Sequence, residues 1–130
     1  MQKLVFEDAW NRTISTCDRE HIINEFKKLT FTTNESPQFT PLWKATNHKN
    51  ELLVTTLIHN CSTTDFTLKN KLMSVDAGNR VVATHQFTLP IKLHAHTSMP
   101  WTFIFPVDHL NAHVQMNQDV QLILSLEKRK

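Results

Sequence analysis

The sequence is poor in residues on which several functional classes depend. It has one glycine, Gly78, so it cannot build a glycine-rich loop that cradles phosphate groups. Its two cysteines, Cys17 and Cys61, form no CxxC pair and no disulfide framework, and both fit a reducing compartment. No apolar run approaches the ~20 residues that a membrane helix needs. The sequence therefore predicts neither a nucleotide-binding loop, nor a disulfide scaffold, nor a membrane span.

An excess of charge of one sign is also lacking. The 14 basic and 12 acidic side chains leave a formal net charge of +2. Only residues 127–130 are locally basic, and Glu127 lies among them, so we expect a solvated tail. Nucleic acids and anionic membranes are bound through concentrated positive charge. We therefore expect neither nucleic-acid binding nor membrane insertion.

The amino-terminal segment bears on location in the cell. Residues 1–12 contain one lysine but no apolar run of about seven residues or more, so no secretion signal is predicted. Together with the cysteines, this predicts a cytoplasmic protein. The length of 130 residues and the apolar content of 40% are typical of one soluble domain, covering residues 1–130.

Hydrophobic periodicity divides the chain into a short helical part and a long β-rich part. Apolar residues recur at helical spacing over residues 18–29, and either Thr16 or Asp18 can cap this helix. From residue 30 onwards, Thr, Val, Ile, Phe and Trp dominate runs that Asn, Pro and Asp interrupt, which is typical of strands. Strands are predicted at 3–6, 39–47, 51–60, 66–75, 80–89, 100–106 and 119–126.

The connections between these strands indicate the fold class. Residues 76–79 give the clearest hairpin signal, because Gly78 tolerates the positive φ of a tight turn. Residues 107–114 can add one helical turn, capped by Asp108. No helices separate the strands, so antiparallel pairing is expected rather than βαβ units. The prediction is a mainly β fold: an antiparallel, Ig-like β-sandwich of six to seven strands with one short N-terminal helix.

The segment SMPWTFIFP concentrates aromatic side chains in a sequence that has no tyrosine. A strand period of two puts Trp101, Phe103 and Phe105 on one face. An aromatic row can stack bases or sugars, but such platforms are usually ringed by Lys or Arg, and the flanks here are Ser, Met, Pro, Val and Asp. We therefore expect these rings to form the core of a central strand, which Pro100 opens and Pro106 closes.

The same segment carries a resemblance to a known family. SMPWTFIFP, together with LVFEDAW at residues 4–10, resembles the SLAP domain of Firmicute bacteria, which has an LVF-x-x-x-W start and a late PWTFIFP strand. The helix, the ELLVTTLIHN strand, the DAGN hairpin and QFTLP follow in the family's order, so the resemblance covers essentially the whole chain. The sequence departs from the pattern at Ser98 and Met99, where Arg is common, and at Cys61, and its loops are short of glycine.

The resemblance implies a role but no catalytic site. Members of the family accompany the accessory Sec system for surface-layer protein export, and some carry two copies of the domain. No catalytic residues are known in the family. The resemblance therefore implies a cytoplasmic, non-enzymatic helper that acts through protein contacts, with secretion machinery or surface-layer proteins as partners. It leaves the oligomeric state open.

Two tryptophans outside that segment are candidates for a partner-binding surface. Trp43 lies in the predicted strand 39–47, where Pro37 and Pro41 favour an edge position, and an exposed edge can accept a strand from a partner. Trp10 follows the first predicted strand and is the second candidate. For both residues, a Trp that caps the core is the alternative interpretation.

The sequence contains no pattern that supports catalysis. His59 is two residues from Cys61, and both would share a strand face, but no third group completes an oriented pair. A small buried thiol at a strand end is the simpler interpretation of Cys61. Carboxylates are scattered singly, so no acid–base pair is indicated. We expect a protein that is not an enzyme and has no cofactor.

The eight histidines leave one alternative of a different class. His94 and His96 would share a face of a strand, and His109 and His113 would share a face of a helical turn. A zinc site needs three or four ligands with supporting partners, and no HExxH or CxxC motif accompanies these residues. A metal- or small-ligand-binding protein built on these four histidines is the alternative function, and it requires their imidazoles to converge.

Overall fold

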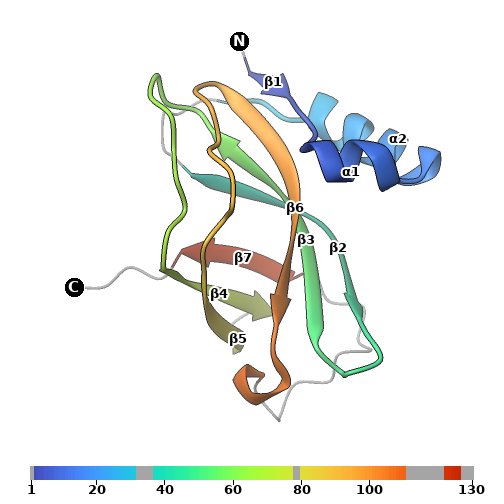
Figure 1. The fold of residues 1–130 in the computed structure, drawn as a ribbon, viewed down its shortest axis with the longest axis vertical. Coiled ribbons are helices and arrows are strands. Elements are labelled where there is room, and N and C mark those ends of the chain that lie inside the picture. Colours follow the sequence, from blue (N-terminus) through green and yellow to red (C-terminus); the bar gives the residue numbers. More distant parts are fainter. Residues whose placement is uncertain (1, 32–36, 78–79, 111–121, 127–130) are drawn as a thin grey trace.

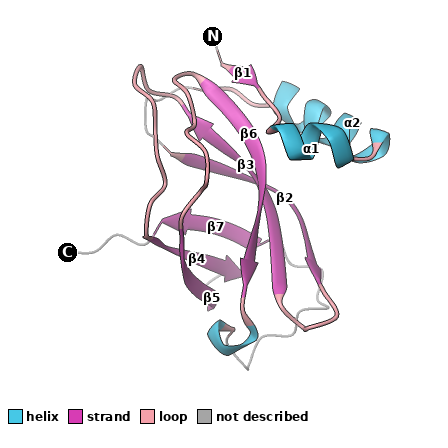
Figure 2. Ribbon diagram, in the orientation of Figure 1, coloured by secondary structure: helices cyan, strands magenta, loops and turns pink. Residues whose placement is uncertain are grey.

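The computed structural model describes residues 2–31, 37–77, 80–110 and 122–126, the last for the backbone alone. Within these ranges the fold is mainly β, as predicted, with seven strands in two sheets and two short α-helices (Figure 1). Figure 2 shows the two α-helices side by side near β1, and a separate helical turn beyond the far end of β6. Predictions made for Gly78, for His113 and for the tail at 127–130 fall outside the described residues.

Two helices, rather than the single one predicted, follow the first strand. Strand β1 (Lys3–Leu4) leads into α1 (Asp8–Thr13) and α2 (Thr16–Lys27). Helix α1 was missed because six residues are too few to show a helical period. The predicted cap of α2 was wrong, because the capping residue is Ser15 rather than Thr16 or Asp18. Ser15 precedes the first helical residue, and its Oγ accepts the backbone N–H of Asp18 at 3.0 Å.

The first sheet is mixed. It contains β2 (Gln38–Thr46), β3 (Leu52–Asn60) and β6 (Thr97–Phe105) in addition to β1, in the order β1-β6-β3-β2. Strands β2 and β6 both run antiparallel to β3, whereas β1 runs parallel to β6. The expectation of purely antiparallel pairing was therefore wrong at β1. The connection from β1 to β6 spans most of the chain, which is long enough to allow either direction.

The second sheet is antiparallel throughout its described strands. Strands β4 (Lys71–Ala77), β5 (Arg80–Phe87) and β7 (Leu122–Leu126) pair in the order β5-β4-β7. The β4–β5 pair confirms the pairing predicted around the hairpin. Strand β4 begins later than the predicted 66–75, because Phe66 forms only an isolated bridge with Leu93.

One apolar core joins the two sheets. The ring of Phe87 from β5 lies with its centroid 5.0 Å from those of Phe103 and Phe105 in β6, in edge-to-face contacts. Full burial of such side chains contributes about 1.5–3 kcal/mol each. The core is drawn from both sheets and includes Val54, Ile58, Met73, Val75, Val82, Met99, Phe103 and Phe105.

The aromatic segment lies inside the mixed sheet as β6. Phe103 and Phe105 are 1% and 0% exposed, Trp101 is partly buried against the core, and Ile104 on the opposite face is 45% exposed. The rings of this segment therefore face the core, and its opposite face reaches the surface.

The prediction that Pro100 opens this strand was wrong, because β6 begins at Thr97. The N–H of Val5 donates to the carbonyl of Ser98 at 2.8 Å, which shows that the backbone of Ser98 points away from β3. The backbone polar groups of successive residues point to alternate sides of a strand. The backbone of Pro100, two residues after Ser98, therefore also points away from β3. Its missing N–H removes no bond from the β3–β6 ladder.

The end of β6 follows the prediction for Pro106 but not the predicted cap at Asp108. Strand β6 ends at Phe105, and Pro106 precedes one turn of 3-10 helix, η1 (Val107–His109). Pro106 occupies the cap position, and no side chain caps this turn.

Candidate interaction surface

The mixed sheet has an outer face, opposite the core, built by alternate residues of β2, β3 and β6. Ala45, Leu53 and Ile104 lie side by side in one row across the three strands. The next row along contains Trp43, Thr55 and Thr102. The hydroxyl oxygens of Thr55 and Thr102 lie 2.8 Å apart, which agrees with their sharing this face.

We call these six residues the three-strand patch. None of them carries a charge, and Ile104 is its most exposed large apolar side chain. Leu53 is half-buried, although every other residue of β3 is buried. An uncharged surface that spans three strands can dock a protein.

The segment that follows α2 packs against the other end of the same face. The ring of Phe31, which follows α2, lies with its centroid 4.9 Å from that of His59. The ring of His21 lies 5.6 Å from that of Trp43, at the border of the patch. The helices sit near β1, and the β2–β3 turn extends away from them (Figure 1). The three-strand patch thus lies beyond the end that Phe31 covers, and α2 contacts its border through His21.

Trp43 lies on an edge strand, as predicted, because β2 ends the order of the mixed sheet. A register shift between Pro41 and Trp43 interrupts the strand, and β7 of the second sheet lies close to β2. Both features disfavour addition of a partner strand at this edge. Trp43 instead presents a half-buried ring on the sheet face.

Trp10 lies in α1 and is half-buried. Among the described residues, no ring contact joins it to Trp43, so the structure does not unite the two candidates. The sequence did not single out Ala45, Leu53 or Ile104. Alternation places Ile104 opposite the aromatic row, but only the register between strands brings it beside Leu53.

His59, at the covered end, is held in a buried polar network. Its Nδ1 lies 2.6 Å from Ser98 Oγ, and its Nε2 lies 2.8 Å from Thr40 Oγ1. Burial lowers the pKa of His59 to about 4, so the ring is neutral near pH 7. Both ring nitrogens already have hydroxyl partners, and neither contacts Cys61.

Cys61 is buried, and Cys17 is exposed. Burial raises the pKa of the Cys61 thiol, which disfavours the thiolate. The side-chain amide of Gln38 lies 3.7 Å from the Cys61 sulfur. These surroundings are those of a structural thiol.

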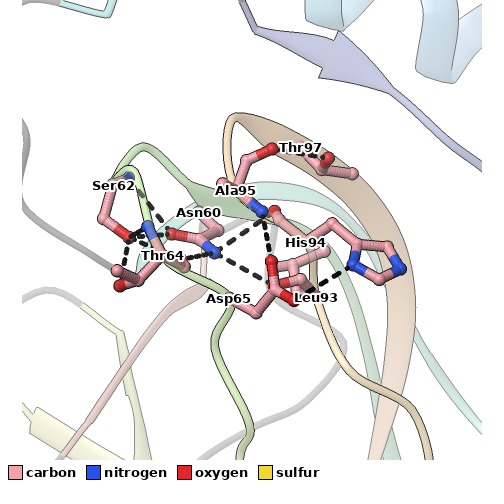
Figure 3. A network of polar contacts seen from close by, with 8 residues as sticks. All are labelled: Asn60, Ser62, Thr64, Asp65, Leu93, His94, Ala95 and Thr97. Carbon is pink, nitrogen blue, oxygen red and sulfur yellow. Dashed lines mark hydrogen bonds and ion pairs between the residues drawn. The ribbon is translucent and has the colours of Figure 1, made fainter.

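A second polar network ties two loops together beyond the end of β3 (Figure 3). The side-chain amide of Asn60 donates to the carbonyls of Thr64 and Leu93 at 2.9 and 3.0 Å. Asp65 accepts the N–H of Ala95 at 3.1 Å, and this bond, more than the adjacent His94, lowers its pKa. Asn60 and Asp65 thus fix the loop that precedes β6.

The histidines of the alternative function are not brought together where the structure describes them. The Nδ1 atom of His94, in the loop before β6, lies 3.4 Å from Oδ2 of Asp65. His96, two residues on, is in a turn with φ of 52° rather than in a strand. His109 lies in η1, after β6. Within the described ranges, no group of three or more His, Cys, Asp or Glu side chains could hold a metal ion.

His109 instead pairs with His85 of β5, a residue that the sequence did not single out. Their Nδ1 atoms lie 3.2 Å apart, and their ring centroids 4.6 Å apart at 80°. The two residues are separated by 24 positions, so no local spacing could have indicated the pair.

Comparison with known proteins identifies a family and nothing narrower. No described helix is long and apolar enough to cross a membrane. No curated protein and no solved structure shows a significant match to the chain. The model of the SLAP domain family matches residues 4–125, nearly the whole chain, including the LVF start and the β6 aromatic segment. The chain therefore belongs to the SLAP domain family.

Proposed function

We propose that this SLAP domain is a non-enzymatic protein-interaction module that docks a partner through the three-strand patch. The observation that carries the proposal is the uncharged row of Ala45, Leu53 and Ile104, with Ile104 45% exposed at its end. Burying this row against a partner removes apolar surface from water, which is the main driving force of protein association.

The surroundings of the patch resemble the polar rim of a protein interface. The β2–β3 turn carries Lys49, which is exposed, and Glu51, which is half-buried, directly beyond the row of Ala45 and Leu53. Charged groups at a rim steer and orient a partner while the centre supplies affinity. A partner with an apolar contact surface and a mixed-charge border fits this arrangement.

The polar clusters support a binding role over a catalytic one. Both ring nitrogens of His59 hydrogen-bond with hydroxyl groups, and the side-chain amide of Asn60 donates hydrogen bonds to loop carbonyls. A general base needs a free nitrogen or oxygen directed at a substrate. We therefore assign both hydrogen-bond networks a structural role, which is to hold the mixed sheet and its adjoining loops in place.

The cellular role that we propose rests on family membership. It is assistance in accessory Sec-dependent export or in surface-layer assembly, carried out in the cytoplasm. The partner is then a component of the secretion machinery or a surface-layer protein.

Affinity capture from the native cell with matched baits tests both statements. The baits are the wild type, Ile104→Glu and Val5→Glu. Ile104 and Val5 are equally exposed at 45%, but Val5 lies outside the patch. We expect the wild type and V5E to retain the same protein and I104E to lose it.

Retention of that protein by I104E would refute the docking surface. Recovery of a partner that is neither a secretion component nor a surface-layer protein would refute the cellular role. Circular dichroism of the three baits controls for folding.

A further inference from the structure

The pair of His85 and His109 joins two elements that the chain does not connect directly. His85 is half-buried in β5, and His109 is exposed in η1. Leu110, the next residue, forms an isolated antiparallel bridge with Ala83. The two imidazoles therefore lie where η1 meets the outer edge of β5.

The separation of the two rings matches that of two ligands on one metal ion. An ion bonded to both nitrogens at about 2.0–2.1 Å, with a near-tetrahedral angle, holds them roughly 3.3 Å apart. The Nδ1 atoms of His85 and His109 lie 3.2 Å apart. A carbonyl oxygen, that of Thr84, lies 3.0 Å from the Nδ1 of His109. The His85 nitrogen and this oxygen thus both lie within 3.2 Å of the His109 nitrogen.

The proton that lies between the two rings need not block a metal ion. One ring now donates an Nδ1 proton to the other. In the described part of the chain, the Nε2 atoms of this pair have no partner, so that proton can move to Nε2 without net release.

A surface groove beside the pair gives an ion access and room for water ligands. Its described walls include Thr84, Asp108, His109 and Leu110, and among the described lining residues Asp108 is the one acidic side chain. Two protein nitrogens, a carbonyl and water suit zinc or copper, which prefer imidazole ligands.

We propose that His85 and His109 form an open two-histidine site for a divalent transition-metal ion such as Zn²⁺ or Cu²⁺, which clasps η1 to β5. The site shares only His109 with the four-histidine alternative. It is independent of the docking function, because the three-strand patch belongs to the other sheet.

Titration of the wild-type protein with zinc chloride, followed by isothermal calorimetry, tests the site. We expect one ion per chain, with affinity reduced at least tenfold in His85→Gln and in His109→Gln and unchanged in His94→Gln. His94 is the matched control, because it is exposed and, within the described ranges, its ring hydrogen-bonds with Asp65 rather than with a second histidine. Because both substitutions remove the same site, the double variant H85Q/H109Q should bind zinc no more weakly than either single variant.

A second measurement does not depend on variants. Long-range ¹H–¹⁵N spectra of the histidine rings during the zinc titration should shift the Nδ1 signals of His85 and His109 before those of other histidines. Absence of binding at millimolar zinc, or equal affinity in H85Q, H109Q and wild type, would overturn the proposal. Simultaneous shifts of all exposed histidines would also overturn it.

Discussion

The two ends of the outer face of the mixed sheet differ in what covers them. At one end, His59 and Leu57 of β3 are 1% and 0% exposed, and the ring of Phe31, which follows α2, packs against that of His59. At the other end, Leu53 of the same strand is half-buried and Ile104 beside it is exposed. Leu53 is thus the one residue of β3 that is not buried. The apolar character of β3 is continuous, so the sequence of the strand does not by itself explain the difference.

The largest expected effect compares two leucines of this face. Leu57 and Leu53 lie on the same side of β3, one covered and one at the open end. Leu57→Ala should lower the free energy of unfolding by about 2–5 kcal/mol, because it leaves a cavity. Leu53→Ala should cost less than about half as much, since its cavity opens to water. Urea denaturation measures both, and equal costs would contradict the distinction between the ends.

The second effect concerns acid at the covered end. The ordinary pKa of a histidine is 6.5, and burial lowers the pKa of His59 in the folded protein to about 4. Between these pH values the unfolded chain binds more protons than the folded one, so stability falls as pH falls from 6.5 to 4. The loss attributable to His59 reaches about 3 kcal/mol. Burial also lowers the pKa of His85, which acts in the same direction.

His59→Gln separates the two contributions. Urea denaturation at several pH values from 7 to 4 should show a shallower loss of stability in the variant than in the wild type. Parallel curves would show that His59 is not the buried group that titrates. His85→Gln, which leaves the covered end intact, is the companion control.

A smaller effect is expected at the threonine pair of the open end. Thr55 is buried and hydrogen-bonds with Thr102 at 2.8 Å. Thr102→Val leaves the Thr55 hydroxyl without this partner and should cost about 1 kcal/mol or more. The double variant T55V/T102V should recover part of that loss in thermal denaturation. A double variant that costs the sum of both single ones would rule out coupling.

The smallest change in stability is expected at Ala45, on the exposed end of the row. Ala45→Lys places a charge on the three-strand patch, yet it should alter the free energy of unfolding by less than about 0.5 kcal/mol. Partner capture should nevertheless fall, because docking would bury that charge. Unchanged capture would limit the interface to Leu53 and Ile104.

Much of the fold could be predicted from the sequence, because strand runs and their breakers are local signals. The residue pattern of β3, the pairing of β4 with β5 and the inward aromatic row of β6 all follow from period and turn chemistry. Helix α1 and the parallel β1–β6 pair did not follow, because six residues and a two-residue contact leave no period. The position of Pro100 inside β6 could not be predicted either. It depends on the backbone of Pro100 facing away from β3, which pairs with β6 along its whole length.

The candidate site was less predictable than the fold. Trp43 was singled out because nearby prolines favour an edge position for its strand, but its neighbours Leu53 and Ile104 meet only through register. The packing of α2 and Phe31 against this face depends on how a helix docks, which a sequence pattern does not encode. The pair of His85 and His109 likewise depends on the meeting of η1 and β5.

Site-specific photo-crosslinking in the native cell tests the central claim most directly. A photoreactive amino acid replaces Ile104 in one strain and the equally exposed Val5 in another. If a partner docks on the open end of the sheet, Ile104 should give a discrete crosslinked protein band and Val5 should not. Crosslinking at Val5 without crosslinking at Ile104 would contradict the account.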